Sequence, residues 1–337
     1  MRRSSSRESF LPFTHKKANG NTNIVQAKIS AKSSGNKLQS VLHNWSAGRQ
    51  DLKTLVVYVY SGSDPEYEDN LRFFLRTAVK EDDGCDYVIV IQTGANLTEF
   101  SNRPALPTNA RYLEHPNKCF DWGTSGWVFE NGHANPNIYR YFVFLNSSGR
   151  GPYLPAYLPP GFHWTQALTN KLTASVKLVG PSINCGGGYG HPPISHVQTY
   201  ALATDRQGLK ALADAGTVFH CWETMAETVI HSELGASIVI KEAGFSIDSL
   251  MLRYQGLDWR DSQSNACNGG LNPIQWGFYD GIDVNPLEVL FIKVKKSMHE
   301  AGWGHVQQAV KYDLWSQQAL AANMSTMTVE QKQESSM

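Results

Sequence analysis

The stretch from Ile138 to Pro152 runs a pattern typical of a buried strand directly into a small polar turn. Its first part contains Y-F-V-F-L, an apolar run suited to a strand that is covered on both faces. The turn then comprises Asn146, Ser147, Ser148, Gly149, Arg150 and Gly151. Ligands of open α/β sheets bind outside the carboxyl ends of strands, where glycines let the backbone approach and a guanidinium offers a planar fork for phosphate. The turn therefore predicts a diphosphate site, with an ordinary polar turn as the alternative.

Glu233 is a candidate general base. It follows His231 in a predicted helix that packs through Ile230 and Leu234, so its carboxylate stands at the edge of an apolar face. Such a position can raise the pKa of a carboxyl group and let it accept a proton from an attacking hydroxyl. The alternative is an ordinary surface acid.

Other polar residues complete the candidate site. Asp121 either caps a short helix or fixes a hydroxyl of a nucleotide or sugar. His196 and Gln198 alternate along a predicted strand, so both point to one face. Ser61 and Gly62 follow the first buried strand. We therefore predict one pocket at the ends of the first and central strands.

Cysteine and histidine chemistry is disfavoured. Cys185, His191 and His196, with His163 upstream, match no metal-ligand spacing, and a Gly-Pro loop is a poor frame for tetrahedral zinc. Cys185 or Cys221 could pair with a histidine as in a hydrolase, but cysteine is commonly a small buried residue. The first strand is followed by Y-S-G-S-D in place of G-x-G-x-x-G, and no P-loop sequence occurs, which argues against dinucleotide oxidoreductases and P-loop enzymes.

The composition narrows the class of protein. The 30 acidic and 30 basic residues cancel, so no strongly basic face for nucleic acid is expected. The 9 Trp and 14 Tyr suit sugars, although aromatic residues also fill large cores. The five cysteines are scattered without a C-x-x-C pair, so we expect no dense disulfide framework, and their odd number leaves at least one thiol free. No run reaches the roughly 20 apolar residues that span a bilayer.

The chain divides into four expected parts. Residues 1–50 are rich in Ser, Lys, Arg and Asn and show no apolar period, so we expect a disordered or targeting segment. A transit peptide, a truncated gene product and a loose cytosolic tail remain open for it. We expect one α/β domain at 51–296, a C-terminal helix at 297–323 and a tail at 324–337.

Strand and helix patterns alternate through the domain. We predict strands at 54–60, 86–92, 110–113, 141–145, 176–179, 196–200 and 217–222, and helices at 65–78, 162–172, 209–215 and 228–244. This alternation predicts a mostly parallel sheet with helices on both faces, in one Rossmann-like domain of a nucleotide-binding type. Residues 250–281 read as a long loop rich in Asn, Asp, Gly and Trp, and loops of that length tend to be functional or disordered.

Several stretches share their order and approximate spacing with one known family. They are N-K-C-F-D-W-G, F-L-N-S-S-G-R-G-P, V-K-L-V-G-P-S-I-N-C, S-H-V-Q-T-Y-A-L-A-T-D, E-L-G-A-S with A-G-F downstream, and N-P-L-E-V-L-F-I-K-V. Together, from about Leu55 to Val294, they resemble the rhamnan synthesis protein F type of glycosyltransferase and its eukaryotic relatives. The resemblance implies a glycosyltransferase A fold, a nucleotide-sugar donor and a polysaccharide or glycan acceptor, as in cell-wall polysaccharide biosynthesis.

The resemblance also implies roles for individual residues. Its motifs are matched by Asn117, Asp121, Gly123, Asn146, Ser148, Gly151, Pro152, His196, Gln198, Glu233 and Gly235. With the turn residues above, we expect donor binding by Ser61, Gly62, Asn117, Asp121, Gly123, Asn146, Ser147, Ser148 and Gly151. We expect Glu233, Arg150 and His196 to be catalytic, and Gln198 to bind the acceptor.

Ser147 departs from the bacterial members of the family, which tend to carry an aspartate there. A divalent ion on a diphosphate is usually held by a carboxylate, because hard cations take charged oxygen ligands. The neutral turn therefore predicts no metal ligand of its own and at most a weakly held Mn or Mg, with Arg150 on the leaving diphosphate.

The expected activity is a hexosyl or deoxyhexosyl transfer. A non-catalytic carbohydrate- or nucleotide-sugar-binding protein with the same fold is the alternative, since the turn carries Ser147 where the bacterial members tend to carry an aspartate. The resemblance suggests the secretory pathway or Golgi, although we identify neither a signal peptide nor an anchor in the sequence.

Overall fold

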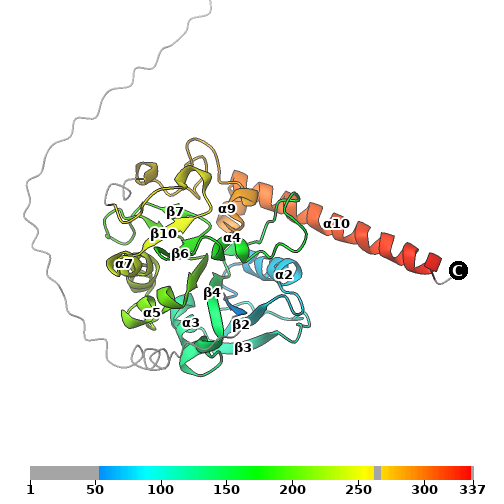
Figure 1. Ribbon diagram of the computed structural model, residues 1–337, viewed down its shortest axis with the longest axis horizontal. Helices are drawn as coiled ribbons and strands as arrows, with labels where there is room; N and C mark the ends of the chain where they lie inside the picture. Colours follow the sequence, from blue (N-terminus) through cyan, green and yellow to red (C-terminus); the bar gives the residue numbers. More distant parts are fainter. Residues whose placement is uncertain (1–52, 262–266, 335–337) are drawn as a thin grey trace, which may run out of the picture. The chain divides into compact units, whose positions relative to one another are not determined.

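The computed structural model describes residues 53–261 and 267–334. The expected N-terminal segment at 1–50 lies outside this part of the chain. A seven-stranded sheet with the order β10-β6-β9-β4-β1-β2-β3 organises the domain (Figure 1). Its strands are β1 Lys53–Tyr60, β2 Cys85–Thr93, β3 Ala110–Pro116, β4 Tyr139–Asn146, β6 Val176–Gly180, β9 Ala201–Asp205 and β10 Ser246–Ser249.

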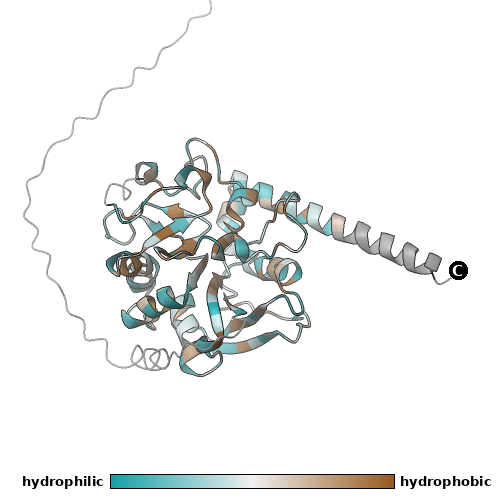
Figure 2. Cartoon of the chain, viewed as in Figure 1, coloured by the Kyte–Doolittle hydropathy of each residue, from teal (hydrophilic) through white to brown (hydrophobic). Residues whose placement is uncertain are grey.

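The sheet is mostly parallel, as predicted. Neighbouring strands are parallel except at β9, which is antiparallel to both β4 and β6. β1 and β2 are buried along nearly their whole length, which explains their continuous apolar sequences. Figure 2 shows hydrophobic residues recurring along these strands.

Helices cover both faces of the sheet, which confirms the predicted α/β architecture. The helical segments are α2 Glu66–Ala78, α3 Phe120–Glu130, η1 Pro136–Ile138, α4 Gln166–Thr169, α5 Arg206–Asp214, α6 Met225–Glu227, η2 Thr228–Leu234, α7 Gly235–Glu242, η3 Leu252–Tyr254, α8 Pro286–Val289, α9 Lys296–Glu300 and α10 Gly304–Glu334. Phe144 is in register with Val57, so Tyr58 points to the opposite face. Phe74 of α2 packs on Tyr58, and Trp122 of α3 packs on Phe144.

Two short antiparallel pairs lie outside the main sheet. β5 Gly149–Arg150 pairs with β11 Ile292–Lys293, and β7 Ile183–Asn184 pairs with β8 His196–Val197. The first pair joins the turn after β4 to a strand that is distant in sequence. It therefore brings the C-terminal part of the domain to the end of the central strand.

Several predicted elements differ in the structure. The expected strand at 217–222 is absent, because its apolar residues pack on α3 through Phe219 and its backbone turns. The expected helix at 162–172 is reduced to α4, and the expected strand at 196–200 pairs only over β8. β10 was not predicted, because S-I-D-S is too short and polar for a clear strand pattern. Helix α10 continues past the expected boundary at 323 to Glu334.

Two disulfides cross-link the domain. They join Cys119 to Cys221 and Cys185 to Cys267. Cys85 is a buried free thiol, which confirms the prediction of at least one. Over the described residues, no helix has the length and apolar character needed to cross a membrane.

Candidate functional site

The two predicted turns meet at one edge of the sheet. β1 and β4 are parallel neighbours, with Val59 in register with Asn146. The backbone N–H of Ser61 donates to Ser147 Oγ at 2.6 Å, and that hydroxyl lies 3.2 Å from the carbonyl oxygen of Val59, to which it donates. The turns after the first and central strands are thus hydrogen-bonded to each other.

A cavity of about 510 Å³ lies at this edge. It is lined by Val59, Ser61, Ser63, Tyr67, Gln92, Asn117, Phe120, Asp121, Asn146, Ser147, Ser148, Tyr189, Met225, Thr228, Val229, Glu233, Lys293 and Lys295. Seven of these were singled out from the sequence: Ser61, Asn117, Asp121, Asn146, Ser147, Ser148 and Glu233. We call it the main cavity.

Asp121 enters the main cavity from the first turn of α3. Asn146 Nδ2 donates a hydrogen bond to Oδ2 of Asp121 at 2.7 Å, and this bond connects α3 to the end of β4. The two residues before it, Cys119 and Phe120, have φ angles of 67° and 51°, a left-handed conformation that costs non-glycine residues about 1–3 kcal/mol each. The Cys119–Cys221 disulfide covalently anchors this left-handed segment before α3. Burial raises the pKa of Asp121, against the hydrogen bond from Asn146.

Glu233 lines the same cavity as Asp121. It lies in η2, a π-helical turn, and such turns occur frequently at functional sites. Burial raises the pKa of Glu233, and the negative charge of Asp121 raises it further. Lys293 and Lys295 act in the opposite direction. A carboxyl group with a raised pKa, lining a cavity, has the property expected of a general base.

The two lysines were missed by the sequence analysis. Lys293 ends β11 and Lys295 follows two residues later, so alternation along an extended chain directs both to one side. Burial lowers the pKa of Lys295, and the neighbouring charge of Lys293 lowers it further. The K-V-K spacing was the available signal, but only the pairing of β11 with β5 brings it to the cavity.

A second cavity of about 150 Å³ opens beside the first. The two share Asn146, Val229, Glu233 and Lys293. The remaining lining is Asn184, Gly187, Gly188, His196, Gln198, Thr199, Tyr200, Leu234 and Asn272. His196 and Gln198 thus line the second cavity together with Glu233.

The polar groups of the second cavity are oriented by neighbours. Burial lowers the pKa of His196 to about 4, so its ring is neutral at neutral pH. Its Nδ1 lies 2.8 Å from the carbonyl oxygen of Ile194, which can only accept, so Nδ1 carries the proton. Gln198 accepts from Ser182 Oγ at 2.8 Å and donates to Asn272 Oδ1 at 3.3 Å. These side chains are fixed in a polar pocket suited to hydroxyl groups.

Arg150 does not line either cavity, contrary to the expected contact with a diphosphate. Its side chain is buried, and Nε donates to Asn70 Oδ1 at 2.6 Å while a terminal nitrogen pairs with Glu66 at 3.1 Å. Asn70 Nδ2 in turn lies 2.8 Å from the carbonyl oxygen of Ser147 and 3.1 Å from that of Val294, and donates to both. Arg150 therefore orients Asn70, which connects the turn after β4 to the backbone that follows β11.

Three predicted glycines also lie outside the lining. A Cβ atom at Gly62 would lie 1.9 Å from the carbonyl oxygen of Thr98, at Gly123 2.9 Å from that of His220, and at Gly151 2.5 Å from that of Leu290. Each glycine lets two backbone segments approach closely. Their observed role is packing beside the site.

The weighed alternatives with Cys185 and Cys221 are wrong, because both sulfurs are in disulfides and cannot act as thiolates. In the described chain, the group that could hold a metal comprises Asp83, Cys85 and His163. His163 places Nε2 3.2 Å from Asp83 and Nδ1 2.8 Å from Thr165 Oγ1, and burial raises the pKa of the Cys85 thiol to about 12. We interpret this group as a hydrogen-bonded cluster at the start of β2.

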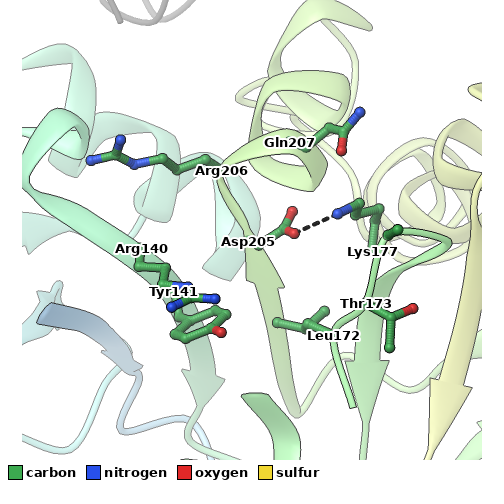
Figure 3. A pocket seen from close by; sticks show the side chains of 9 residues that line it. Arg140, Tyr141, Leu172, Thr173, Lys177, Asp205, Arg206 and Gln207 are labelled. Atoms are coloured by element: carbon green, nitrogen blue, oxygen red, sulfur yellow. Dashed lines mark hydrogen bonds and ion pairs between the residues drawn. The ribbon is translucent and has the colours of Figure 1, made fainter. Parts of the chain in front are cut away.

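A further cavity of about 410 Å³ lies at the opposite edge of the sheet (Figure 3). Arg140 and Tyr141, in the first half of β4, form one wall. Asp205 pairs with Lys177 at 2.6 Å and also caps α5 through the backbone N–H of Gly208 at 2.9 Å. The acid of this cavity already serves the fold, so we do not assign the reaction to it.

Comparisons with known proteins leave the family open. No protein-family model matches the chain, and no curated protein matches it. Among solved structures, the mannosyltransferase PcManGT of Pyrobaculum calidifontis, in complex with GDP-Man and Mn²⁺, is similar at 12% sequence identity and a TM-score of 0.34. The match covers 64% of this chain and 62% of that chain. A similarity of this size carries no argument about the ligand or the reaction.

The Cys119–Cys221 bridge is expected to stabilise the wall that carries Asp121. Replacing both cysteines by serine should lower the free energy of unfolding by about 2–5 kcal/mol and expose the segment before α3 to proteases. Chemical denaturation and limited proteolysis measure the two effects. Cys85→Ala controls for the loss of a buried cysteine. Unchanged proteolysis near Cys119 would contradict the proposed anchoring.

The raised pKa of Glu233 predicts a pH-dependent effect of Glu233→Gln. A carboxyl group whose pKa is higher in the folded chain favours folding below its unfolded pKa, and this contribution is lost as the pH rises through the folded pKa. Glutamine does not ionise, so the variant should gain stability relative to wild type between about pH 4 and about pH 8. Denaturation at both pH values measures this. The exposed Glu242→Gln should show no such trend, and an equal trend in both variants would refute the assignment.

Proposed function

We propose that this protein is a glycosyltransferase that moves a sugar from a nucleotide-sugar donor to a glycan acceptor. The observation that carries the proposal is the main cavity, where two carboxyl groups with raised pKa values face two lysines at the carboxyl ends of β1 and β4. Its volume of about 510 Å³ lies in the range of small-molecule and cofactor sites. Ligands bind at this edge in open α/β sheets.

The donor would occupy the main cavity. Lys293 and Lys295 supply positive charge for the diphosphate, in place of the guanidinium expected from the sequence. Asp121, held by Asn146, would accept a hydrogen bond from a ribose or sugar hydroxyl. The hydroxyl of Ser61, which lines the cavity, would add a hydrogen bond to the phosphates.

The acceptor would enter the second cavity, where its hydroxyl can reach Glu233. In the transfer, the acceptor oxygen bonds to the anomeric carbon while the bond from that carbon to the diphosphate oxygen breaks. Glu233 takes the proton of the attacking hydroxyl, and the lysines stabilise the charge that develops on the leaving diphosphate. Both cavities share Glu233 and Lys293, which suits a reaction between two bound substrates.

The finer assignments belong to the same proposal. The quoted motifs support membership of the rhamnan synthesis protein F type of glycosyltransferase, a hexosyl or deoxyhexosyl transfer, polysaccharide biosynthesis and a place in the secretory pathway. The second candidate is a non-catalytic nucleotide-sugar- or carbohydrate-binding protein. It is favoured by the neutral turn after β4, where the hydroxyl of Ser147 is engaged with the backbone of Val59 and Ser61.

A bound Mn or Mg ion would have few charged ligands here. Of the residues that line the main cavity, Asp121 and Glu233 are the carboxylates, and two lysines share the same space. Hard cations bind best where several oxygen ligands converge without competing cations. Asp121 is the residue best placed to contribute a ligand, and we propose that any such ion is loosely held. When bound, it would add positive charge next to the diphosphate.

Substitutions in the cavity should separate catalysis from binding. Glu233→Gln should lower kcat for transfer by about 10²–10⁴, the usual contribution of a general base, with little change in donor affinity. Lys293→Met should weaken donor binding and lower kcat by about 10²–10³. Radiolabelled sugar transfer and calorimetric titration with nucleotide-sugars measure these effects.

The chain offers matched controls for both variants. Glu242 on α7 and Lys296 on α9 are exposed, so Glu242→Gln and Lys296→Met should retain full activity. Donor binding by wild type without any transfer or donor hydrolysis would instead establish the non-catalytic alternative.

Chelation provides a separate test of the metal assignment. In this proposal the lysines stabilise the negative charge of the leaving diphosphate. A strong chelator added to wild type should therefore reduce the transfer rate less than the substitution Lys293→Met does. Complete loss of activity on chelation, restored by added Mn²⁺, would show that a metal performs this task.

A further inference from the structure

We propose that the exposed apolar side chains of residues 271–282 form a docking surface for the chain of an oligosaccharide acceptor, beyond the sugar that reacts. We call these residues the apolar platform: Leu271, Trp276, Phe278 and Ile282. Trp276 is 63% exposed and Ile282 is 62% exposed. The proposal rests on the proposed function, because it extends the second cavity.

The platform is held in place by its own backbone and by a disulfide. Gly277 N–H donates to Asp283 Oδ1 at 2.6 Å, and Asn268 Nδ2 donates to the carbonyl oxygen of Phe278 at 2.6 Å. Tyr279 and Ile282 exchange backbone hydrogen bonds of 3.0 and 3.1 Å. Cys267, at the start of the segment, is bonded to Cys185. The apolar side chains are thus exposed on a braced loop.

Asn272 links the loop that carries the platform to the second cavity. This residue lines the cavity, receives a hydrogen bond from Gln198 at 3.3 Å, and accepts another from the backbone N–H of Ile274 at 3.2 Å. Leu271 precedes it, and Trp276 follows four residues later. A glycan whose terminal sugar reaches Glu233 through this cavity would leave it beside these residues.

Another exposed apolar side chain, Leu252, lies on a segment that contacts the loop of the platform. Leu252 is 76% exposed, and its neighbour Arg253 forms an ion pair with Asp280. The backbone N–H of Arg253 also donates to the hydroxyl of Tyr279 at 3.4 Å. Leu252 therefore lies on a loop that is fixed against residues 279–280.

The chemistry of this surface fits a neutral carbohydrate. Sugar rings present apolar faces that pack on aromatic rings and hydroxyl edges that bond to amides and carboxylates. Around the platform, the exposed Gln275 supplies an amide and the exposed Asp280 a carboxylate. The one basic residue among residues 267–283 and 252–254 is Arg253, which is paired with Asp280, so the surface does not favour nucleic acid or anionic lipid.

The test measures binding and transfer along a ladder of neutral oligosaccharides, from a monosaccharide to about six sugars, with Trp276→Ala and Phe278→Ala. An aromatic contact is worth enough to change affinity about tenfold. We expect KM for long acceptors to rise about tenfold in Trp276→Ala, with kcat, monosaccharide transfer and donor hydrolysis unchanged. Tyr157→Ala, at another 86% exposed aromatic residue, is the control and should behave as wild type.

Equal KM values for long acceptors in wild type and Trp276→Ala would overturn the inference. So would concentration-dependent dimerisation of wild type that Trp276→Ala abolishes, because a second copy would then be the occupant. The proposed function fails separately, if wild type neither hydrolyses nor transfers sugar from any nucleotide-sugar. In that case retention on the immobilised oligosaccharide ladder still tests the platform, and retention equal in wild type and Trp276→Ala would refute it.

Discussion

Two acidic and two basic side chains line one cavity and are partly or fully removed from solvent. The surrounding structure has to keep these four charges close to one another. Burial raises the pKa values of both Asp121 and Glu233, and the negative charge of Asp121 raises that of Glu233 further. Lys293 and Lys295 offset the effect of Asp121 on Glu233 but also repel each other. Each of these charges needs an opposite charge or hydrogen bonds nearby, because an uncompensated buried charge costs several kcal/mol. The four charges come from three separate parts of the chain.

Buried polar residues join the segment that carries the lysines to the turn after β4. Asn70 on α2 binds both the turn after β4 and the backbone of Val294, next to the two lysines. Arg150 fixes Asn70 in turn and pairs with Glu66. Arg150, which the sequence predicted to bind a diphosphate, therefore has a structural role. Its position determines where β11 runs and, through β11, where the positive charge of the site lies.

The sequence was informative wherever local pattern determines structure. The apolar runs predicted β1, β2 and β4, and the parallel arrangement then placed their polar ends at one edge, with Asn146 next to Ser61. Local pattern could not place Lys293 and Lys295, since a two-residue strand brings them in from the end of the domain. It also could not orient Arg150, because the partners of that side chain lie on α2. Cysteine spacing, likewise, does not determine which sulfurs pair.

The two disulfides interleave along the chain. Cys185 lies between Cys119 and Cys221, and Cys221 lies between Cys185 and Cys267, so each bridge passes over a cysteine of the other. Loop closure alone favours partners that are close in sequence, such as Cys185 with Cys221, over either native pair. The native connectivity is therefore favoured by the sheet and its long-range contacts, which bring the sulfurs of each pair together. Correct pairing of these cysteines thus depends on the long-range fold of the domain, and disulfides of this kind form and persist under oxidising conditions.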